Sequence, residues 1–220
     1  MKYKAVIFDM DGVLIDSEPL HQKVGYKMMH DLAIPLDEGN FLRFTGTTVI
    51  SMWKTLAQEY ELSQSPEELT SLYNKQFTDR LAGSDEVSLF KGVRDVLENL
   101  NRKGVPVAVA SSSNREVIES VLNHFGIIDH FRIIVSGSDI RHSKPDPEIF
   151  LKVAQVLGLN PSECIVIEDS SNGVMAAKRA GMFCVGFKSK GNHQDITNAS
   201  VIVNSFDEVE AIINSQIIVS

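Results

Sequence analysis

A short apolar run near the start of the chain ends on two aspartates and a glycine. Residues 5–8 read Ala-Val-Ile-Phe, and residues 9–12 read Asp-Met-Asp-Gly. The apolar run predicts a strand that is buried on both faces, as in a parallel sheet. Because side chains alternate along a strand, Asp9 and Asp11 can point the same way. Open α/β sheets bind ligands at the carboxyl ends of their strands, so we expect a polar site there.

The second half of the chain alternates between strand and helix patterns. Five further apolar segments are typical of strands, at residues 105–110, 133–135, 164–167, 183–187 and 201–203. Polar caps precede the intervening helices, as in the capping box predicted at residues 113–116, and glycines follow them. Such alternation predicts a parallel sheet covered by helices. We therefore expect a Rossmann-like α/β core.

A long stretch after the first strand lacks strand patterns and indicates several helices. Ser17-Glu18-Pro19 is typical of a helix start, and apolar residues then recur at helical spacing. Two similar series follow at residues 50–60 and 69–81. We expect residues 16–86 to form an inserted α-helical cap, while residues 1–15 and 87–220 form the core. An insertion at this position can gate a site and select its substrate.

Composition narrows the range of partners. The net charge of −8 and the pI near 5.2 argue against a nucleic-acid surface, which needs clustered Lys and Arg. No apolar run approaches the length of a membrane span, and no signal-peptide pattern is present, so a membrane partner is not expected. Cys164 and Cys184 lie far apart and predict buried free thiols in a reducing compartment. We expect a cytoplasmic monomer that acts on a small molecule.

Four polar clusters lie where the predicted strands and loops meet one edge of the sheet. They are the pair Asp9 and Asp11 and the segments 111–113, 144–146 and 168–169. The first and last of these clusters bring four carboxylates to one place, where Lys144 adds an ammonium group and the serines add hydroxyl groups. Oxygen ligands of this kind suit Mg²⁺, which commonly shares its ligands with a phosphate group. A carboxylate can attack phosphorus when a metal ion and a lysine offset the repulsion between negative charges.

In content and order, these clusters resemble the four motifs of the haloacid dehalogenase-like superfamily. The likeness is to the branch of phosphatases and β-phosphoglucomutase-like enzymes with a helical cap, and it spans nearly the whole chain. Residues 9–13, Asp-Met-Asp-Gly-Val, are similar to the first motif, Asp-x-Asp-Gly-(Val/Thr). Ser111 resembles the second motif, Lys144-Pro145 the third, and Glu168-Asp169 the fourth.

The resemblance implies a role for each motif residue. Asp9 would be the nucleophile that forms an aspartyl-phosphate, and Asp11 would act first as acid and then as base. Ser111 and Lys144 would hold the phosphoryl oxygens. The implied cofactor is Mg²⁺, with the ligands Asp9, the main-chain carbonyl of Asp11, Glu168 and Asp169.

Other candidate substrate-binding residues lie beside these motifs. Ser112 follows the second motif, and His21 is the one histidine near enough to the first motif to face the site. Gly46 and Thr47 belong to a cap loop. Residues 188–190, Lys-Ser-Lys, predict a solvent-exposed loop instead.

Three reactions of the superfamily compete, together with a function without catalysis. Dehalogenases lack the second acid of the first motif, so Asp11 argues against them. Mutases carry a Lys before the cap-loop glycine and an Arg after it, where this chain has Thr45 and Val49. Without that Arg a second phosphate loses its best partner. We therefore favour a sugar or sugar-alcohol phosphatase over a β-phosphoglucomutase-type enzyme. A non-catalytic sugar-phosphate-binding module would be free to lose Asp9 or Asp11.

Overall fold

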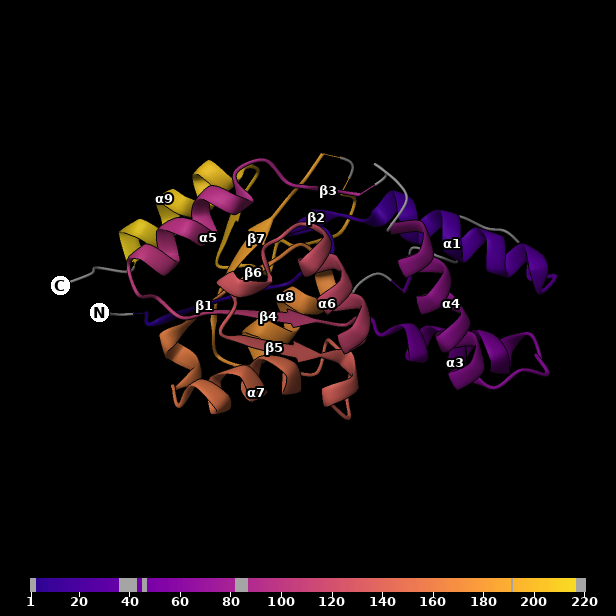
Figure 1. The fold of residues 1–220 in the computed structure, drawn as a ribbon. Coiled ribbons are helices and arrows are strands. Elements are labelled where there is room, and N and C mark those ends of the chain that lie inside the picture. The colour runs from indigo at the N-terminus through magenta and orange to yellow at the C-terminus, as the bar shows by residue number, and fades with distance from the viewer. Residues whose placement is uncertain (1–2, 36–42, 45–46, 82–86, 191, 217–220) are drawn as a thin grey trace.

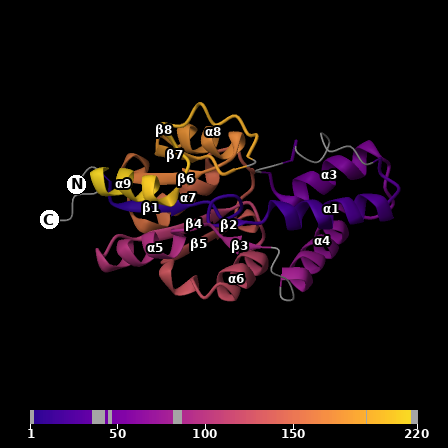
Figure 2. The ribbon, with the colours of Figure 1, turned by 90° about the horizontal axis from the view of Figure 1, so that it is seen from above.

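The computed structural model describes residues 3–35, 43–44, 47–81, 87–190 and 192–216. Its centre is a six-stranded parallel sheet in the order β5-β4-β1-β6-β7-β8, which confirms the expected α/β core (Figures 1 and 2). β1 lies between β4 and β6, so the first aspartate motif follows a central strand. The strands are β1 (Ala5–Phe8), β4 (Val107–Ser111), β5 (Ile133–Ser136), β6 (Cys164–Glu168), β7 (Phe183–Phe187) and β8 (Val201–Val203).

The strand ends differ slightly from the predicted ones, and the differences matter for the site. β4 begins at Val107 rather than at residue 105, because Pro106 has no N–H group to donate to a neighbouring strand. β4, β5 and β6 each extend one residue further than predicted, to Ser111, Ser136 and Glu168. A polar side chain therefore completes each of these strands at the same edge of the sheet.

Helices cover both faces of the sheet. α5 (Val93–Arg102), α6 (Arg115–His124) and α9 (Phe206–Gln216) pack on the face that buries Val6 and Phe8. α7 (Glu148–Leu157) and α8 (Ser171–Arg179) pack on the face that buries Ala5 and Ile7. Because consecutive strand residues point to opposite faces, one apolar strand serves both layers. Short 3₁₀ helices lie at Ile128–His130, Gly137–Asp139 and Pro161–Glu163.

A group of helices lies apart from the sheet, at the end of the molecule opposite the chain termini (Figures 1 and 2). It contains α1 (Glu18–Asp31), α3 (Val49–Glu59) and α4 (Pro66–Leu81). Trp53 and Tyr73 pack within it with their rings in a T-shaped arrangement, 6.3 Å between centroids. Among the described residues, no helix is both long enough and apolar enough to cross a membrane.

Two very short strands connect this helical group to the sheet. β2 (Ile15–Asp16) and β3 (Ser88–Leu89) pair antiparallel where the chain enters and leaves the group. Two residues are too few to show an alternating pattern, so the sequence did not predict this pair. The expected boundary between residues 15 and 16 falls inside β2, and the division into core and cap stays a prediction.

Two serines that the sequence assigns to helix starts have other partners. Ser17 precedes α1, but its side chain makes no cap hydrogen bond and instead donates to Asp11 Oδ1 at 2.6 Å. At α6 the cap is Asn114, whose Oδ1 accepts from the Val117 amide at 3.0 Å, so the capping box predicted at Ser113 is wrong. Ser113 Oγ donates to Asp11 Oδ2 at 3.1 Å. Both hydroxyl groups therefore donate to the partly buried Asp11 carboxylate at the sheet edge.

Candidate active site

Three polar side chains meet at the carboxyl ends of the central strands. Asp9 follows β1, Ser111 ends β4 and Glu168 ends β6, and β1 lies between the other two strands. A cavity of about 700 Å³ opens between this sheet edge and the helical group. Its lining includes Asp9 and Asp11 from the core and residues of α1, α3 and α4. The strand order therefore places the predicted motifs opposite the predicted cap.

Lys144 is buried at this edge between two carboxylates. Its Nζ donates to Asp9 Oδ1 at 2.6 Å, to Glu168 Oε1 at 2.7 Å and to the Ala110 carbonyl at 3.2 Å. Only 2% of the lysine is exposed. Burial alone would lower the pKa of Lys144, but the negative charges of Asp9 and Glu168 raise it above its ordinary value. The ammonium group therefore stays charged and holds both carboxylates in place.

Glu168 is fixed on all sides. Its Oε2 accepts from the amide and the hydroxyl group of Ser170, at 2.8 and 3.0 Å. A Cβ atom at Gly173 would lie only 1.6 Å from Glu168 Oε1, so this helical position has no room for a side chain. Each carboxylate oxygen has more than one lone pair. Glu168 can thus orient Lys144 and still contribute to a metal site, and its role as a ligand stays a prediction.

Asp11 lies in a different environment from Asp9. It accepts hydrogen bonds from Ser17 and Ser113, and the His21 Nε2 atom lies 3.1 Å from its Oδ1. Burial alone would raise the pKa of Asp11, but His21 and the two hydroxyl groups lower it below its ordinary value. Burial alone would lower the pKa of His21, whereas the Asp11 carboxylate raises it. His21 therefore faces the first motif as expected, and its nearest partner there is Asp11.

Asp169 approaches the turn that follows β1. A Cβ atom at Gly12, whose φ is +75°, would lie 2.1 Å from Asp169 Oδ2. A glycine is needed here both for the left-handed backbone and for this close approach. From the other side, the Asn192 side chain donates to the main-chain carbonyl of Asp169 at 2.9 Å and to its Oδ2 at 3.2 Å.

The charges around the cavity favour the binding of a cation. Burial raises the pKa of Asp9 to about 8, because Lys144 offsets only part of its effect and Glu168 adds negative charge. Burial also raises the pKa of Asp169 well above its ordinary value, and Glu168 and Asp9 raise it further. Both Asp9 and Asp169 line the cavity. A divalent cation would stabilise their ionised forms, and carboxylate and carbonyl oxygens are the ligands that Mg²⁺ prefers. The residues present therefore fit Mg²⁺.

The other predicted substrate-binding residues are not all at the cavity surface. Ser112 and Thr47 line the cavity. Thr47 Oγ1 donates to the Phe44 carbonyl at 2.7 Å. Ser111 and Lys144 are buried behind the cavity wall, and Ser111 Oγ accepts from the Ser113 amide at 3.1 Å. Gly46, like Thr45, lies outside the described residues. These substrate-binding assignments stay predictions.

Several residues of the site were not found from the sequence. Ser17 has the signature of a helix cap, and Tyr73, whose hydroxyl lies 2.9 Å from His21 Nδ1, fits a buried helix face. Ser113 belongs to the segment 111–113 that the sequence places at this edge, but its contact with Asp11 has no sequence signal. Asn192 carries no local signal. The segment 188–190 was predicted to be solvent-exposed; Lys188 and Lys190 are indeed exposed, but Ser189 and Lys190 also line the cavity.

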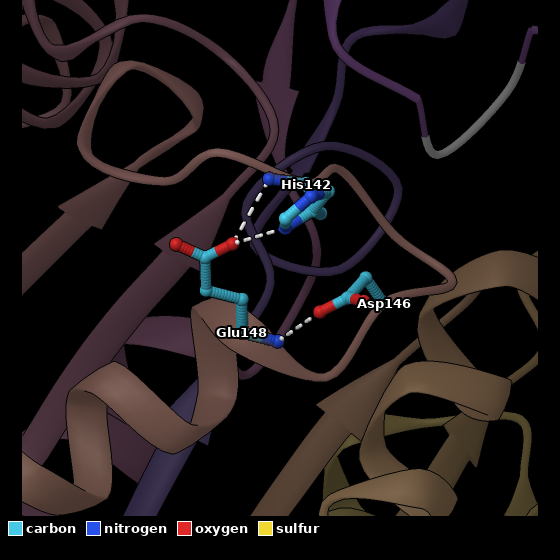
Figure 3. Close-up of side chains that lie close together, drawn as sticks. All are labelled: His142, Asp146 and Glu148. Carbon is cyan, nitrogen blue, oxygen red and sulfur yellow. Dashed lines mark hydrogen bonds and ion pairs between the residues drawn. The ribbon is translucent and has the colours of Figure 1, made fainter.

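A second group of possible metal ligands lies at the start of α7: His142, Asp146 and Glu148 (Figure 3). The two Glu148 oxygens accept from the amides of Arg141 and His142 at 3.0 and 2.9 Å, and Asp146 Oδ1 accepts from the Glu148 amide at 3.0 Å. These hydrogen bonds join the ends of the loop before α7 and need no metal ion. They fasten both ends of the loop that carries Lys144.

Comparison with known proteins places these features in a family. The family described as haloacid dehalogenase-like hydrolase matches residues 6–187. Hexitol phosphatase B of Escherichia coli O157:H7 is 31% identical over 210 residues, which are 94% of this chain and 94% of that protein. The bifunctional riboflavin kinase/FMN phosphatase of Arabidopsis thaliana is 32% identical over 93% of this chain, which spans about half, 54%, of that protein.

A solved structure of similar architecture extends the comparison. The β-phosphoglucomutase of Clostridium difficile superposes with a TM-score of 0.84 and is 27% identical, with 97% of this chain and 96% of that chain covered. The likeness therefore includes the helical group as well as the sheet.

The contact between Gly173 and Glu168 predicts that a glycine-to-alanine substitution in a helix destabilises the protein, which is the reverse of the usual effect. In a helix, replacing glycine by alanine ordinarily stabilises the protein by about 1 kcal/mol. We expect Gly173→Ala to lower the free energy of unfolding instead, by about 1–3 kcal/mol, because the new methyl group overpacks a buried carboxylate. Urea denaturation measures the change. Stabilisation by Gly173→Ala would show that Glu168 is not held against this helix.

Proposed function

The chain belongs to the haloacid dehalogenase-like hydrolase family, and we propose that it is a phosphatase that hydrolyses a small phosphorylated carbohydrate with the help of Mg²⁺. The observation that carries the proposal is the contrast between two aspartates of one motif. Asp9 is held by the Lys144 ammonium group, whereas Asp11 is held by His21 and two hydroxyl groups. Two carboxylates in such different settings are suited to two different tasks.

Asp9 is the nucleophile in this proposal. Its Oδ1 is fixed at 2.6 Å from Lys144 Nζ, and the residue faces the cavity. A carboxylate oxygen attacks phosphorus, the bond between phosphorus and the substrate oxygen breaks, and an aspartyl-phosphate forms. Bound Mg²⁺ would offset the negative charge shared by the carboxylates and the phosphoryl group. Asp9 and Asp169, with the main-chain carbonyl of Asp11, would hold it.

Asp11 handles the proton in both half-reactions. The leaving oxygen of the substrate needs a proton, and the attacking water must later lose one. His21 Nε2 lies 3.1 Å from Asp11 Oδ1, close enough for the two groups to share a proton, and Ser17 and Ser113 restrain the Asp11 carboxylate. The pair gives this proton to the leaving oxygen. It regains one from the water that attacks the aspartyl-phosphate, as the bond between phosphorus and the Asp9 oxygen breaks, the carboxylate re-forms and inorganic phosphate leaves. Atoms and charge balance over the two steps.

The cavity lining supports a polyhydroxylated substrate. Gln22 and Tyr26 of α1 reach the cavity from the cap side, and His193 and Gln194 reach it from the core side. These groups can donate and accept hydrogen bonds, as recognition of a sugar or sugar alcohol requires. The name of the hexitol phosphatase relative points to the same substrate class.

Asp9→Asn tests the nucleophile. The amide has nearly the same shape but cannot attack phosphorus, so we expect phosphate release to fall by roughly 10⁴-fold or more. The assay screens a panel of sugar and sugar-alcohol phosphates, with Mg²⁺ and after treatment with EDTA. Asp95→Asn, on α5 and exposed, is the matched control and should behave as wild type. A few per cent of wild-type activity left in Asp9→Asn would count heavily against the assignment.

A phosphomutase is the second candidate, because the β-phosphoglucomutase structure superposes over nearly the whole chain. Such an enzyme must hold a second phosphate group. Val49 lines the cavity at the position where the resemblance to mutases implies an arginine. Its side chain carries no charge and forms no hydrogen bond. This difference favours the phosphatase.

The two candidates predict different products. The enzyme is given β-glucose 1-phosphate with a trace of the bisphosphate, and glucose 6-phosphate and inorganic phosphate are followed together. We expect release of inorganic phosphate without isomerisation. A mutase must hold the second phosphate group of its bisphosphate intermediate, and the apolar side chain of Val49 cannot bind that group. Glucose 6-phosphate that forms much faster than inorganic phosphate would establish the mutase instead.

A further inference from the structure

The loop after β7 contacts the fourth motif directly. Asn192 Nδ2 donates to the main-chain carbonyl of Asp169 at 2.9 Å and to its Oδ2 at 3.2 Å. The other end of the same amide is also engaged, since Asn192 Oδ1 accepts from the Gln194 main-chain amide at 2.8 Å. A main-chain N–H can only donate, so the oxygen must face Gln194 and the NH₂ group must face Asp169. The orientation of Asn192 is therefore determined by its own contacts.

We propose that Asn192 is a positioning residue, which holds the Asp169 carboxylate in the orientation that binds the divalent cation. The proposal rests on the proposed function, in which Asp169 is a ligand of Mg²⁺. Asp169 is confined between two neighbours: the Gly12 backbone, where an added Cβ would lie 2.1 Å from Oδ2, and the Asn192 amide. With Oδ2 restrained in this way, the carboxylate cannot turn freely about its bond to Cβ.

A neutral donor suits this position better than a cation would. Lys144 already neutralises part of the charge of Asp9 and Glu168 through contacts of 2.6 and 2.7 Å. A second ammonium group on Asp169 would compete with Mg²⁺ for the same negative charge. An amide stabilises the ionised carboxylate by hydrogen bonds and leaves its charge available. Groups that orient metal ligands in this way commonly change metal affinity when they are removed.

The loop itself is anchored to the start of α8, so Asn192 does not depend on a single contact for its place. Gln194 Oε1 accepts from the Ser171 amide at 3.4 Å, and Ser171 Oγ donates to the Asp195 carbonyl at 2.7 Å. Lys190 and His193 of the same loop line the cavity. The same loop therefore contacts the proposed cation ligand Asp169 and lines the cavity where the substrate would bind.

Asn192→Ala tests the proposal through the affinity for Mg²⁺, measured by isothermal titration calorimetry with Mg²⁺ alone and no substrate. We expect the dissociation constant to rise by roughly 10- to 100-fold. Asn198→Ala is the matched control: it lies exposed on the same connection, and its Oδ1 accepts from Lys178 Nζ at 3.2 Å. Its affinity for Mg²⁺ should equal that of the wild type. Melting temperatures without Mg²⁺ show that both variants fold.

The outcomes separate this proposal from the proposed function. The positioning role would be overturned if Asn192→Ala bound Mg²⁺ as tightly as Asn198→Ala does and differed only in a lower melting temperature. It would also be overturned if the wild-type protein bound no Mg²⁺. If Asn192→Ala does not fold, Asn192→Ser takes its place, because serine is too short to reach Asp169. Weakened Mg²⁺ binding in a protein that hydrolyses no phosphate ester would support the role of Asn192 and contradict the phosphatase.

Discussion

The buried contact between Lys144 and the carboxylates of Asp9 and Glu168 organises the sheet edge. An unpaired charge in a protein interior costs several kcal/mol, so the three groups must stay together once they are buried. Much of the surrounding structure serves that requirement. The parallel order places β1 beside β6, and Gly173 makes room for Glu168. Hydrogen bonds of Asp146 and Glu148 join the ends of the Lys144 loop.

The same edge carries more negative than positive charge. Lys144 cannot neutralise every acidic group around it, and burial raises the pKa of both Asp9 and Asp169. Asp11 escapes this effect because His21 and two hydroxyl groups lower its pKa. One motif therefore contains two aspartates whose pKa values shift in opposite directions. A metal ion would stabilise the ionised form of Asp9, whereas the ionised form of Asp11 is already stabilised by its hydrogen bonds. This difference in environment underlies the division of labour that we propose.

Sequence patterns predicted the parallel core well because the signals were long or repeated. β7 and β8 coincide with the predicted segments 183–187 and 201–203, and the motif residues Asp9, Ser111 and Glu168 lie at or directly after the carboxyl ends of their strands. Contacts made across the fold were beyond such patterns. Ser17 and Ser113 resemble helix caps in the local sequence. Their hydrogen bonds to Asp11 arise only because the fold brings that carboxylate beside them. Asn192 lies 23 residues after Asp169 in a loop whose path no periodicity describes.

The central claim is that this edge of the sheet is completed by a divalent cation. The most direct test is diffraction from crystals grown with Mn²⁺, which favours the same oxygen ligands as Mg²⁺ and can be located by its anomalous signal. The claim predicts one strong peak in contact with the carboxylates of Asp9 and Asp169 and the main-chain carbonyl of Asp11. No peak there, or a peak at His142, Asp146 and Glu148 instead, would contradict it.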